Sequence, residues 1–327
     1  HRNLVAGGVE PARPFRMFGH ELYRERGGVR YIASRYGELY PLDKAPGTYR
    51  IVVLGGSTTE NKHTYELKGY HCPLLVQQQL REQLGRDDIE AINIANSAYA
   101  TPHALILLEL DVLSWQPDLI VVSHNVNDLL AAYWPNPTFD YANKYSHPFY
   151  GVPDIEHIYT PANIVFQHSQ LYWVVRDGVE QLTASGEWPP LQRRSYGSEP
   201  PALVAGAFER NLRSIVALAQ ANGIDVLLGT QPLQPSEPYF LRHMAYKSYN
   251  DVVVYPEHDE FVQHHRAFNE IIRRVARETG VYLADNDPVL NGEERYFIDF
   301  VHYTPLGVTR LAENVTDVIV EQGIVDK

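Results

Sequence analysis

Two short segments carry the residue types of a serine-based acyl-transfer site. Residues 55–60 read GGSTTE and place the hydroxyl of Ser57 just after two glycines, where the chain can turn sharply. Near the C-terminus, Asp299 stands three residues before His302. A carboxylate at that spacing can fix the tautomer and orientation of an imidazole, which can then accept a proton from a serine. Each pattern is common by chance, and the plainer interpretation of residues 55–60 is a turn or a helix cap.

Two further segments could supply hydrogen-bond donors to such a site. Residues 93–98 read NIANSA, and their small side chains would let a backbone N–H approach a ligand closely. Residues 125–128 read NVND, and polar groups of this kind are expensive to bury without partners. Taken separately, both segments are typical of tight loops and helix caps.

The elements that must position these segments alternate between buried strands and helices. We expect strands, from continuous β-branched and apolar runs, at residues 49–54, 89–95, 118–123, 224–229 and 281–285. We expect helices at residues 65–84, 102–115, 202–222, 259–279 and 305–322. This order predicts an α/β fold, a doubly wound, five-stranded parallel sheet with helices on both faces. Such sheets bind ligands at the carboxyl ends of their strands, where three of the four polar segments fall.

Taken together and in this order, the four segments resemble the motifs of the SGNH (GDSL-type) hydrolases, which are serine esterases and lipases on a flavodoxin-like sheet. The motif Gly-Asp-Ser-x-Thr is matched at residues 55–59, with Gly56 in place of the aspartate. The motif Asn-x-Gly-x-x-Gly is matched at residues 93–98, with alanines replacing both glycines.

The remaining two motifs are closer to the family pattern. Gly-x-Asn-Asp is matched at residues 125–128, with Asn125 in place of the glycine. Asp-x-x-His is intact at Asp299 and His302. The resemblance covers residues 50–320 apart from the long insertions.

The resemblance implies a site that needs neither a metal nor an organic cofactor. Ser57 would be the nucleophile, His302 the general base, and Asp299 the group that orients the imidazole. The oxyanion hole would consist of the Ser57 N–H, the Ala95 N–H and the side-chain amide of Asn127. The fold implied is the flavodoxin-like sheet already expected from the strand pattern.

We expect a single SGNH-hydrolase-like domain over residues 1–327, with an N-terminal extension at 1–48 and insertions at 132–201 and 231–257. The extension should wrap the edge of the sheet, or else form a stem from a lost anchor. The insertions combine aromatic rings with Pro, Asn and His, which suits a cleft for a sugar or another polar ester. Packing of these rings onto the body is the plainer interpretation. The rings are Tyr133, Trp134, Phe139, Tyr141, Tyr145, Phe149, Tyr150, Tyr159, Tyr239, Phe240, Tyr246 and Tyr249.

The amino-acid composition limits which kinds of partner and metal site the protein can have. The chain has 28 Lys and Arg against 40 Asp and Glu, a net charge of −12, which argues against nucleic acid as a partner. The single cysteine excludes an intramolecular disulfide and a cysteine-built metal site. No stretch approaches the roughly 20 apolar residues that span a bilayer. The chain begins at His1, so a signal peptide or an N-terminal anchor could have preceded it, and an extracytoplasmic, bacterial location is favoured.

Other polar residues could bind a metal or assist catalysis, but a structural role is the plainer interpretation for most of them. His258, Asp259, His264 and His265 suggest a metal site, but an amphipathic helical pattern that includes His265 favours buried or half-buried histidines. His243 lies in an insertion without recognised ligand spacing. Asp285 and Asp287 follow the last strand and could compete as the partner of the catalytic histidine.

The favoured function is hydrolysis of a short-chain acyl ester, acetyl above all, of a carbohydrate or similar polar alcohol. An acyltransferase on the same fold would differ only in admitting an acceptor alcohol instead of water. A non-catalytic ligand-binding domain is a second class, supported only by the replaced glycines. A metal-dependent hydrolase is a distant third, which insensitivity to chelators would dismiss.

Overall fold

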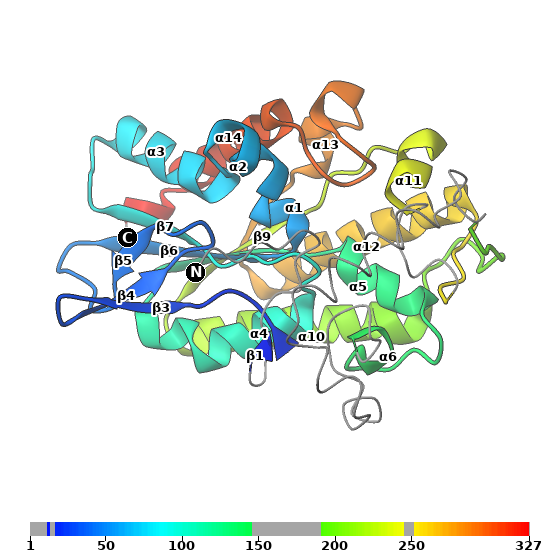
Figure 1. The fold of residues 1–327 in the computed structure, drawn as a ribbon, viewed down its shortest axis with the longest axis horizontal. Coiled ribbons are helices and arrows are strands. Elements are labelled where there is room, and N and C mark those ends of the chain that lie inside the picture. Colours follow the sequence, from blue (N-terminus) through cyan, green and yellow to red (C-terminus); the bar gives the residue numbers. More distant parts are fainter. Residues whose placement is uncertain (1–11, 14–16, 146–190, 245–251, 327) are drawn as a thin grey trace, which may run out of the picture.

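A five-stranded parallel sheet forms the centre of the molecule (Figure 1). The structure is a computed structural model that describes residues 12–13, 17–145, 191–244 and 252–326. The strands are β6 (Tyr49–Gly55), β7 (Ile89–Asn93), β8 (Leu119–Ser123), β9 (Asp225–Gly229) and β10 (Tyr282–Ala284). Their spatial order is β10-β9-β8-β6-β7, with every neighbouring pair parallel. In chain order this is the flavodoxin-like arrangement 2-1-3-4-5, so the predicted fold class is confirmed.

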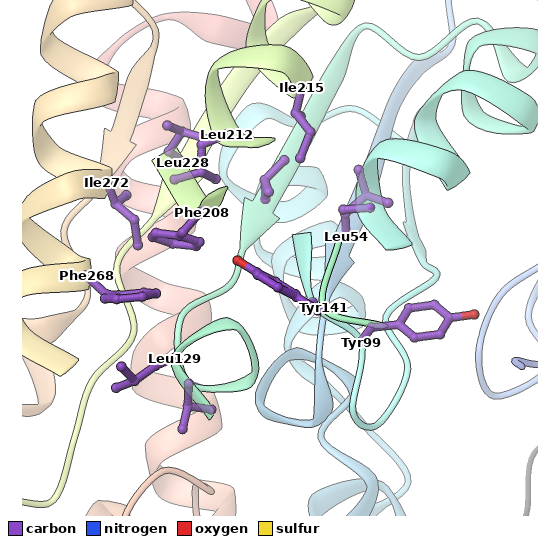
Figure 2. Packing of buried hydrophobic residues seen from close by; sticks show 14 of the residues in the cluster. Leu54, Tyr99, Leu129, Tyr141, Phe208, Leu212, Ile215, Leu228, Phe268 and Ile272 are labelled. Atoms are coloured by element: carbon purple, nitrogen blue, oxygen red, sulfur yellow. The ribbon is translucent and has the colours of Figure 1, made fainter. Parts of the chain in front are cut away.

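Helices cover both faces of the sheet because successive strand side chains point to opposite sides. On β6, Ile51 and Val53 pack in the cluster beneath α3 (Cys72–Leu84) and α14 (Pro305–Glu321). Val52 and Leu54 pack on the other side. Three helices cover that side: α4 (Thr101–Leu110), α10 (Ala202–Ala221) and α12 (His258–Thr279). Figure 2 shows side chains of this second layer.

The expected helix over residues 65–84 is broken into shorter pieces, because the sequence contains an end signal and a new start. After β6 the chain turns back in two short helices, α1 (Ser57–Glu60) and α2 (Lys62–Lys68). Gly69 ends α2 in the left-handed conformation, at φ 73°. The ring of His71 then caps α3 by accepting a hydrogen bond from the Leu74 N–H.

The remaining elements are short. The strands are β1 (Ala12–Arg13), β2 (Met17–Phe18), β3 (Tyr23–Arg26), β4 (Val29–Ala33) and β5 (Leu39–Pro41). The helices are α5 (Val126–Leu130), α6 (Ala142–Tyr145), α11 (Glu237–Met244) and α13 (Asp287–Leu290). The 3₁₀ turns are η1 (Val112–Trp115), η2 (Ala131–Tyr133), η4 (Glu294–Tyr296) and η5 (Ile324–Asp326). Within the described ranges, no helix combines the length and the apolar character needed to cross a membrane.

The described part of the N-terminal extension folds against the β7 edge of the central sheet, as expected. Its strands β3, β4 and β5 form an antiparallel sheet of their own. The Arg35 N–H donates to the Asn93 carbonyl at 2.7 Å, and the Tyr40 hydroxyl donates to the Ala91 carbonyl at 3.3 Å. The extension therefore contacts β7 up to its last residue.

A buried carboxylate links this extension to the start of α1. Glu60 is fully buried, and its Oε1 lies 2.7 Å from Nε and 2.6 Å from a terminal nitrogen of Arg35. The Ser97 hydroxyl donates to Oε2 of Glu60 at 2.5 Å. These contacts tie together the extension, α1 and the loop after β7.

We expect Arg35→Ala to lower the free energy of unfolding by about 3 kcal/mol, because it leaves the buried Glu60 carboxylate without its cation. Urea unfolding followed by circular dichroism measures the change. Arg310→Ala is the control, since Arg310 forms an exposed pair with Glu313 whose loss should have little effect. Equal unfolding midpoints for the two variants would contradict the expectation.

Candidate active site

Ser57 lies just after the carboxyl end of β6, as the first residue of α1. The chain turns there through two glycines, and a Cβ on Gly55 would lie 2.3 Å from Oγ1 of Thr59. Only glycine therefore fits at position 55 without a shift of α1. Ser57 is half-buried, and its N–H has no acceptor among the described residues.

The structure brings Ser57, His302 and Asp299 into one hydrogen-bonded line. Nε2 of His302 lies 2.8 Å from Oγ of Ser57, and Nδ1 lies 2.7 Å from Oδ2 of Asp299. The other carboxylate oxygen of Asp299 accepts the N–H groups of Val301 at 3.0 Å and His302 at 2.9 Å. The three-residue spacing thus lets the aspartate organise its own loop while it orients the histidine ring.

A second histidine contacts the same carboxylate oxygen. Nδ1 of His243, on α11, lies 2.9 Å from Oδ2 of Asp299, and its ring packs edge-on against Phe300 with centroids 5.0 Å apart. No role for His243 was expected from the sequence. No local signal could have found it, because it lies 56 residues before Asp299 in a segment without a motif.

The two contacts fix which histidine nitrogens carry hydrogen. An ionised carboxylate only accepts hydrogen bonds, so both Nδ1 atoms must donate to Asp299. In neutral His302 the Nε2 atom then presents its lone pair to the Ser57 hydroxyl. Burial alone would raise the pKa of Asp299. The charge on His302 and the hydrogen bonds from His243 and His302 outweigh burial and hold that pKa well below its usual range.

The same three residues are the group of potential metal ligands found in the described part of the chain. Their separations of 2.7 and 2.9 Å from nitrogen to oxygen are hydrogen-bond distances. Two ligands at about 2.0–2.1 Å from a tetrahedral zinc would be about 3.4 Å apart. The arrangement therefore fits hydrogen-bonded side chains better than a metal centre.

The other polar residues considered from the sequence as metal ligands or catalytic partners lie in structural contacts outside the site. His264 and His265 are fully buried on α12, as the amphipathic pattern favoured for His265. The His264 ring bonds the Tyr133 hydroxyl at 2.8 Å. Asp285 and Asp287 form ion pairs with Arg273, at 2.7 and 3.5 Å, rather than contacting His302.

Asn127 lies directly against the residue before the serine. A Cβ on Gly56 would be 2.6 Å from Nδ2 of Asn127 and 3.0 Å from the Tyr99 carbonyl oxygen. The same Nδ2 donates one hydrogen bond to that carbonyl at 3.0 Å. An amide has two N–H hydrogens, so a second one remains for a ligand beside Ser57.

The prediction that Ala95 supplies an oxyanion donor is wrong in this geometry. The Ala95 N–H donates to the side-chain oxygen of Asn93 at 3.0 Å, and Ala95 is fully buried. Within the described residues, two half-buried N–H groups of this loop lack an acceptor, those of Ser97 and Ala98. Ala98 occupies the place of the second glycine of the motif and has φ 66°, a conformation that glycine favours.

Comparison with known proteins decides the family. Residues 53–310 match the model of the GDSL-like Lipase/Acylhydrolase family. The chain belongs to this family. Membership makes it a carboxylic ester hydrolase.

Solved structures that resemble this GDSL-like hydrolase include three from bacteria or a metagenome. A GDSL-like lipase from Bacteroides thetaiotaomicron is 14% identical, with a TM-score of 0.43 over 84% of this chain and 87% of the other. An acetylxylan esterase from Geobacillus stearothermophilus is 13% identical, with a TM-score of 0.48 over 84% and 96%. An α/β hydrolase from the Lake Arreo metagenome is 13% identical, with a TM-score of 0.45 over 86% and 98%. No curated protein sequence matches the chain.

The suggestion that aromatic rings line a cleft of this GDSL-like hydrolase is wrong for most of the rings that the structure describes. Tyr133, Trp134, Tyr141, Tyr145 and Phe240 are each at most 2% exposed. They pack into the core, as the plainer interpretation had it, and Figure 2 shows Tyr141 within the buried cluster. Five of the rings lie outside the described residues: Phe149, Tyr150, Tyr159, Tyr246 and Tyr249.

We expect Gly56→Ala to lower kcat of this GDSL-like hydrolase by about 10- to 100-fold, because the new Cβ must displace the Asn127 amide from the serine. The family motif carries aspartate at this position, so restoring it should harm the enzyme for the same reason. Steady-state kinetics on p-nitrophenyl acetate measures the effect. Gly206→Ala on α10 is the control, since its Cβ would meet nothing within 4 Å. Equal activity in both variants would refute the crowding argument.

Replacing His243 by phenylalanine removes one of the two imidazole hydrogen bonds to Oδ2 of Asp299. The carboxylate then stabilises the imidazolium of His302 more strongly, so a higher pH is needed to reach the neutral ring that acts as base. We expect the acidic limb of kcat/KM against pH to move up by about half a pH unit or more.

His243→Gln keeps a donor and should return this limb toward its wild-type position. His264→Gln, a change at another buried histidine, should leave the limb unchanged. A limb that is the same in all four proteins would show that His243 does not influence Asp299.

Proposed function

We propose that this GDSL-like hydrolase removes a short-chain acyl group, acetyl above all, from an ester of a carbohydrate or similar polar alcohol. Ser57, His302 and Asp299 act as a catalytic triad, and the reaction passes through an acyl-enzyme. The observation that carries the proposal is the 2.8 Å contact between Nε2 of His302 and Oγ of Ser57. Both Nδ1 hydrogens are directed at Asp299, so this nitrogen is the basic one.

In the first half of the reaction, Oγ of Ser57 attacks the ester carbonyl carbon while His302 Nε2 takes the serine proton. Asp299 stabilises the imidazolium that results. As the tetrahedral intermediate collapses, the bond to the alcohol oxygen breaks and His302 returns the proton to that oxygen. A water molecule, activated by the same nitrogen, then attacks the acyl-enzyme and releases the acid.

The negative oxygen of the tetrahedral intermediate would be bound by three donors: the N–H groups of Ser57 and Ala98 and the amide of Asn127. Both N–H groups lack acceptors within the described residues, and the amide adjoins Gly56. Each such donor is typically worth about 3 kcal/mol of barrier.

Support for a short acyl group comes from the residues around the serine. The half-buried neighbours Ser97, Ala98 and Asn127 are small or polar and give an alkyl chain little apolar surface. An apolar cavity lies between the sheet and helices α3 and α14, lined in part by Val76 and Val315. Ser57 and His302 do not line that cavity, whereas the residues after them, Thr58 and Tyr303, do.

We expect the purified protein to hydrolyse p-nitrophenyl acetate faster than the octanoate, and Ser57→Ala to lose roughly 10³-fold or more of this activity. Ser214→Ala, on the exposed face of α10, is the control and should retain full activity. A fluorophosphonate probe should label the wild type but not Ser57→Ala.

Other outcomes would overturn parts of the proposal. Activity retained in Ser57→Ala would remove the serine mechanism. Acetyl transfer to an added sugar in preference to water would make the enzyme an acyltransferase. A wild type that neither turns over nor becomes labelled would favour a ligand-binding domain.

A further inference from the structure

Lys144 is a fully buried lysine on α6, outside the four motifs of the family. Its Nζ donates to the backbone carbonyl of Asn127 at 2.5 Å and lies 3.3 Å from the Tyr145 hydroxyl. Nζ also lies over the Tyr145 ring, 4.8 Å from its centroid. Burial of an ammonium group is strongly unfavourable unless it is paired and hydrogen-bonded. A lysine in this place therefore points to a need for its charge or its hydrogen bonds.

A buried negative charge that acts on Lys144 electrostatically is that of Asp128, the residue directly after Asn127. Asp128 is also fully buried, and its carboxylate accepts the N–H of Thr101 at 3.1 Å and the hydroxyl of Thr101 at 2.5 Å. Burial lowers the pKa of Lys144 and raises that of Asp128, and each charge opposes the shift of the other. Lys144 thus contacts the first turn of α5 at the Asn127 carbonyl, and Asp128 ties the same turn to Thr101.

The next residue on α6 holds the second loop beside the serine. The Tyr145 hydroxyl donates to the Ala98 carbonyl at 2.5 Å, and its ring packs edge-on against His103 with centroids 4.6 Å apart. Ala98 needs such support because an alanine at φ 66° is in a conformation that L residues avoid. Asn127 closes the arrangement through its bond to the Tyr99 carbonyl at 3.0 Å.

We propose that Lys144 and Tyr145 are positioning residues of the oxyanion hole. Lys144 fixes the Asn127 backbone and places a positive charge behind the amide that faces the developing oxyanion. Tyr145 holds the carbonyl of Ala98 and so the backbone conformation of this residue, which presents its N–H to the same point. This inference rests on the proposed serine mechanism and adds to it the two side chains that hold its donors in place.

Preorganised donors lower the barrier without tightening substrate binding, so the effect should appear in kcat rather than in KM. We expect Lys144→Met to lower kcat on p-nitrophenyl acetate by about 10- to 100-fold, with KM changed less than about threefold. Tyr145→Phe, which removes only the hydroxyl, should lower kcat by several-fold. Tyr196→Phe is the matched control, because the Tyr196 hydroxyl also donates to a backbone carbonyl, that of Val254 at 2.7 Å. Its kcat should be unchanged.

A double-mutant cycle with Asn127→Ala tests whether Lys144 acts through Asn127. If it does, Lys144→Met has no further effect on kcat once the amide is gone. Losses that multiply in the double variant would overturn the proposal, and so would an unchanged kcat in both Lys144→Met and Tyr145→Phe.

Lys144→Met leaves the Asp128 carboxylate buried without its cation, so that variant could fail to fold. The doubly neutral variant Lys144→Met/Asp128→Asn avoids this, and its kcat should fall as that of Lys144→Met is expected to. A wild-type kcat in this folded variant would refute the role of the charge. Failure of the serine mechanism itself would be recognised separately, as activity retained in Ser57→Ala.

Discussion

One carboxylate oxygen, Oδ2 of Asp299, receives two imidazole N–H groups, and the rest of the site depends on this contact. The pairing leaves Nε2 of His302 as an acceptor at 2.8 Å from the Ser57 hydroxyl. It also keeps Asp299 ionised although the side chain is buried, because the two histidines offset the loss of hydration. With neither donor present, a carboxylate at this depth would favour its neutral form and would no longer hold the ring in one orientation.

Crowding beside Ser57, the proposed nucleophile, explains why the departures from the family motif are compatible with the proposed site. With no side chain at position 56, the Asn127 amide can lie where a Cβ would otherwise be, next to the serine. The alanines in the second motif are not equivalent. Ala95 is fully buried with its N–H bonded to Asn93, whereas Ala98 adopts a positive φ and leaves its N–H without an acceptor in the described part of the chain. One substitution is thus structural, and the other lies at the candidate hole.

The sheet could be predicted from the sequence, because strands buried on both faces consist of continuous apolar runs such as residues 49–54. The contact between Asp299 and His302 was equally accessible, since three residues in one loop determine it. His243 was not, because its role depends on how α11 packs against a loop 56 residues further on. The buried tyrosines show a related limit. Composition cannot distinguish a ring such as Tyr141, which is fully buried, from one that faces a cleft.

The two segments expected to be insertions contact different parts of the proposed site, one the acid–base side chains and the other the oxyanion donors. His243, from residues 231–257, contacts the carboxylate of Asp299, which orients the proposed base His302. Lys144 and Tyr145, from residues 132–201, contact the backbones of Asn127 and Ala98. Strand ends place the reacting residues near one another, but a donor displaced by about 1 Å loses much of its effect on the barrier. Side chains with two or more partners keep such donors in place. The family motifs therefore supply the reacting groups, and the segments between them supply the contacts that hold those groups.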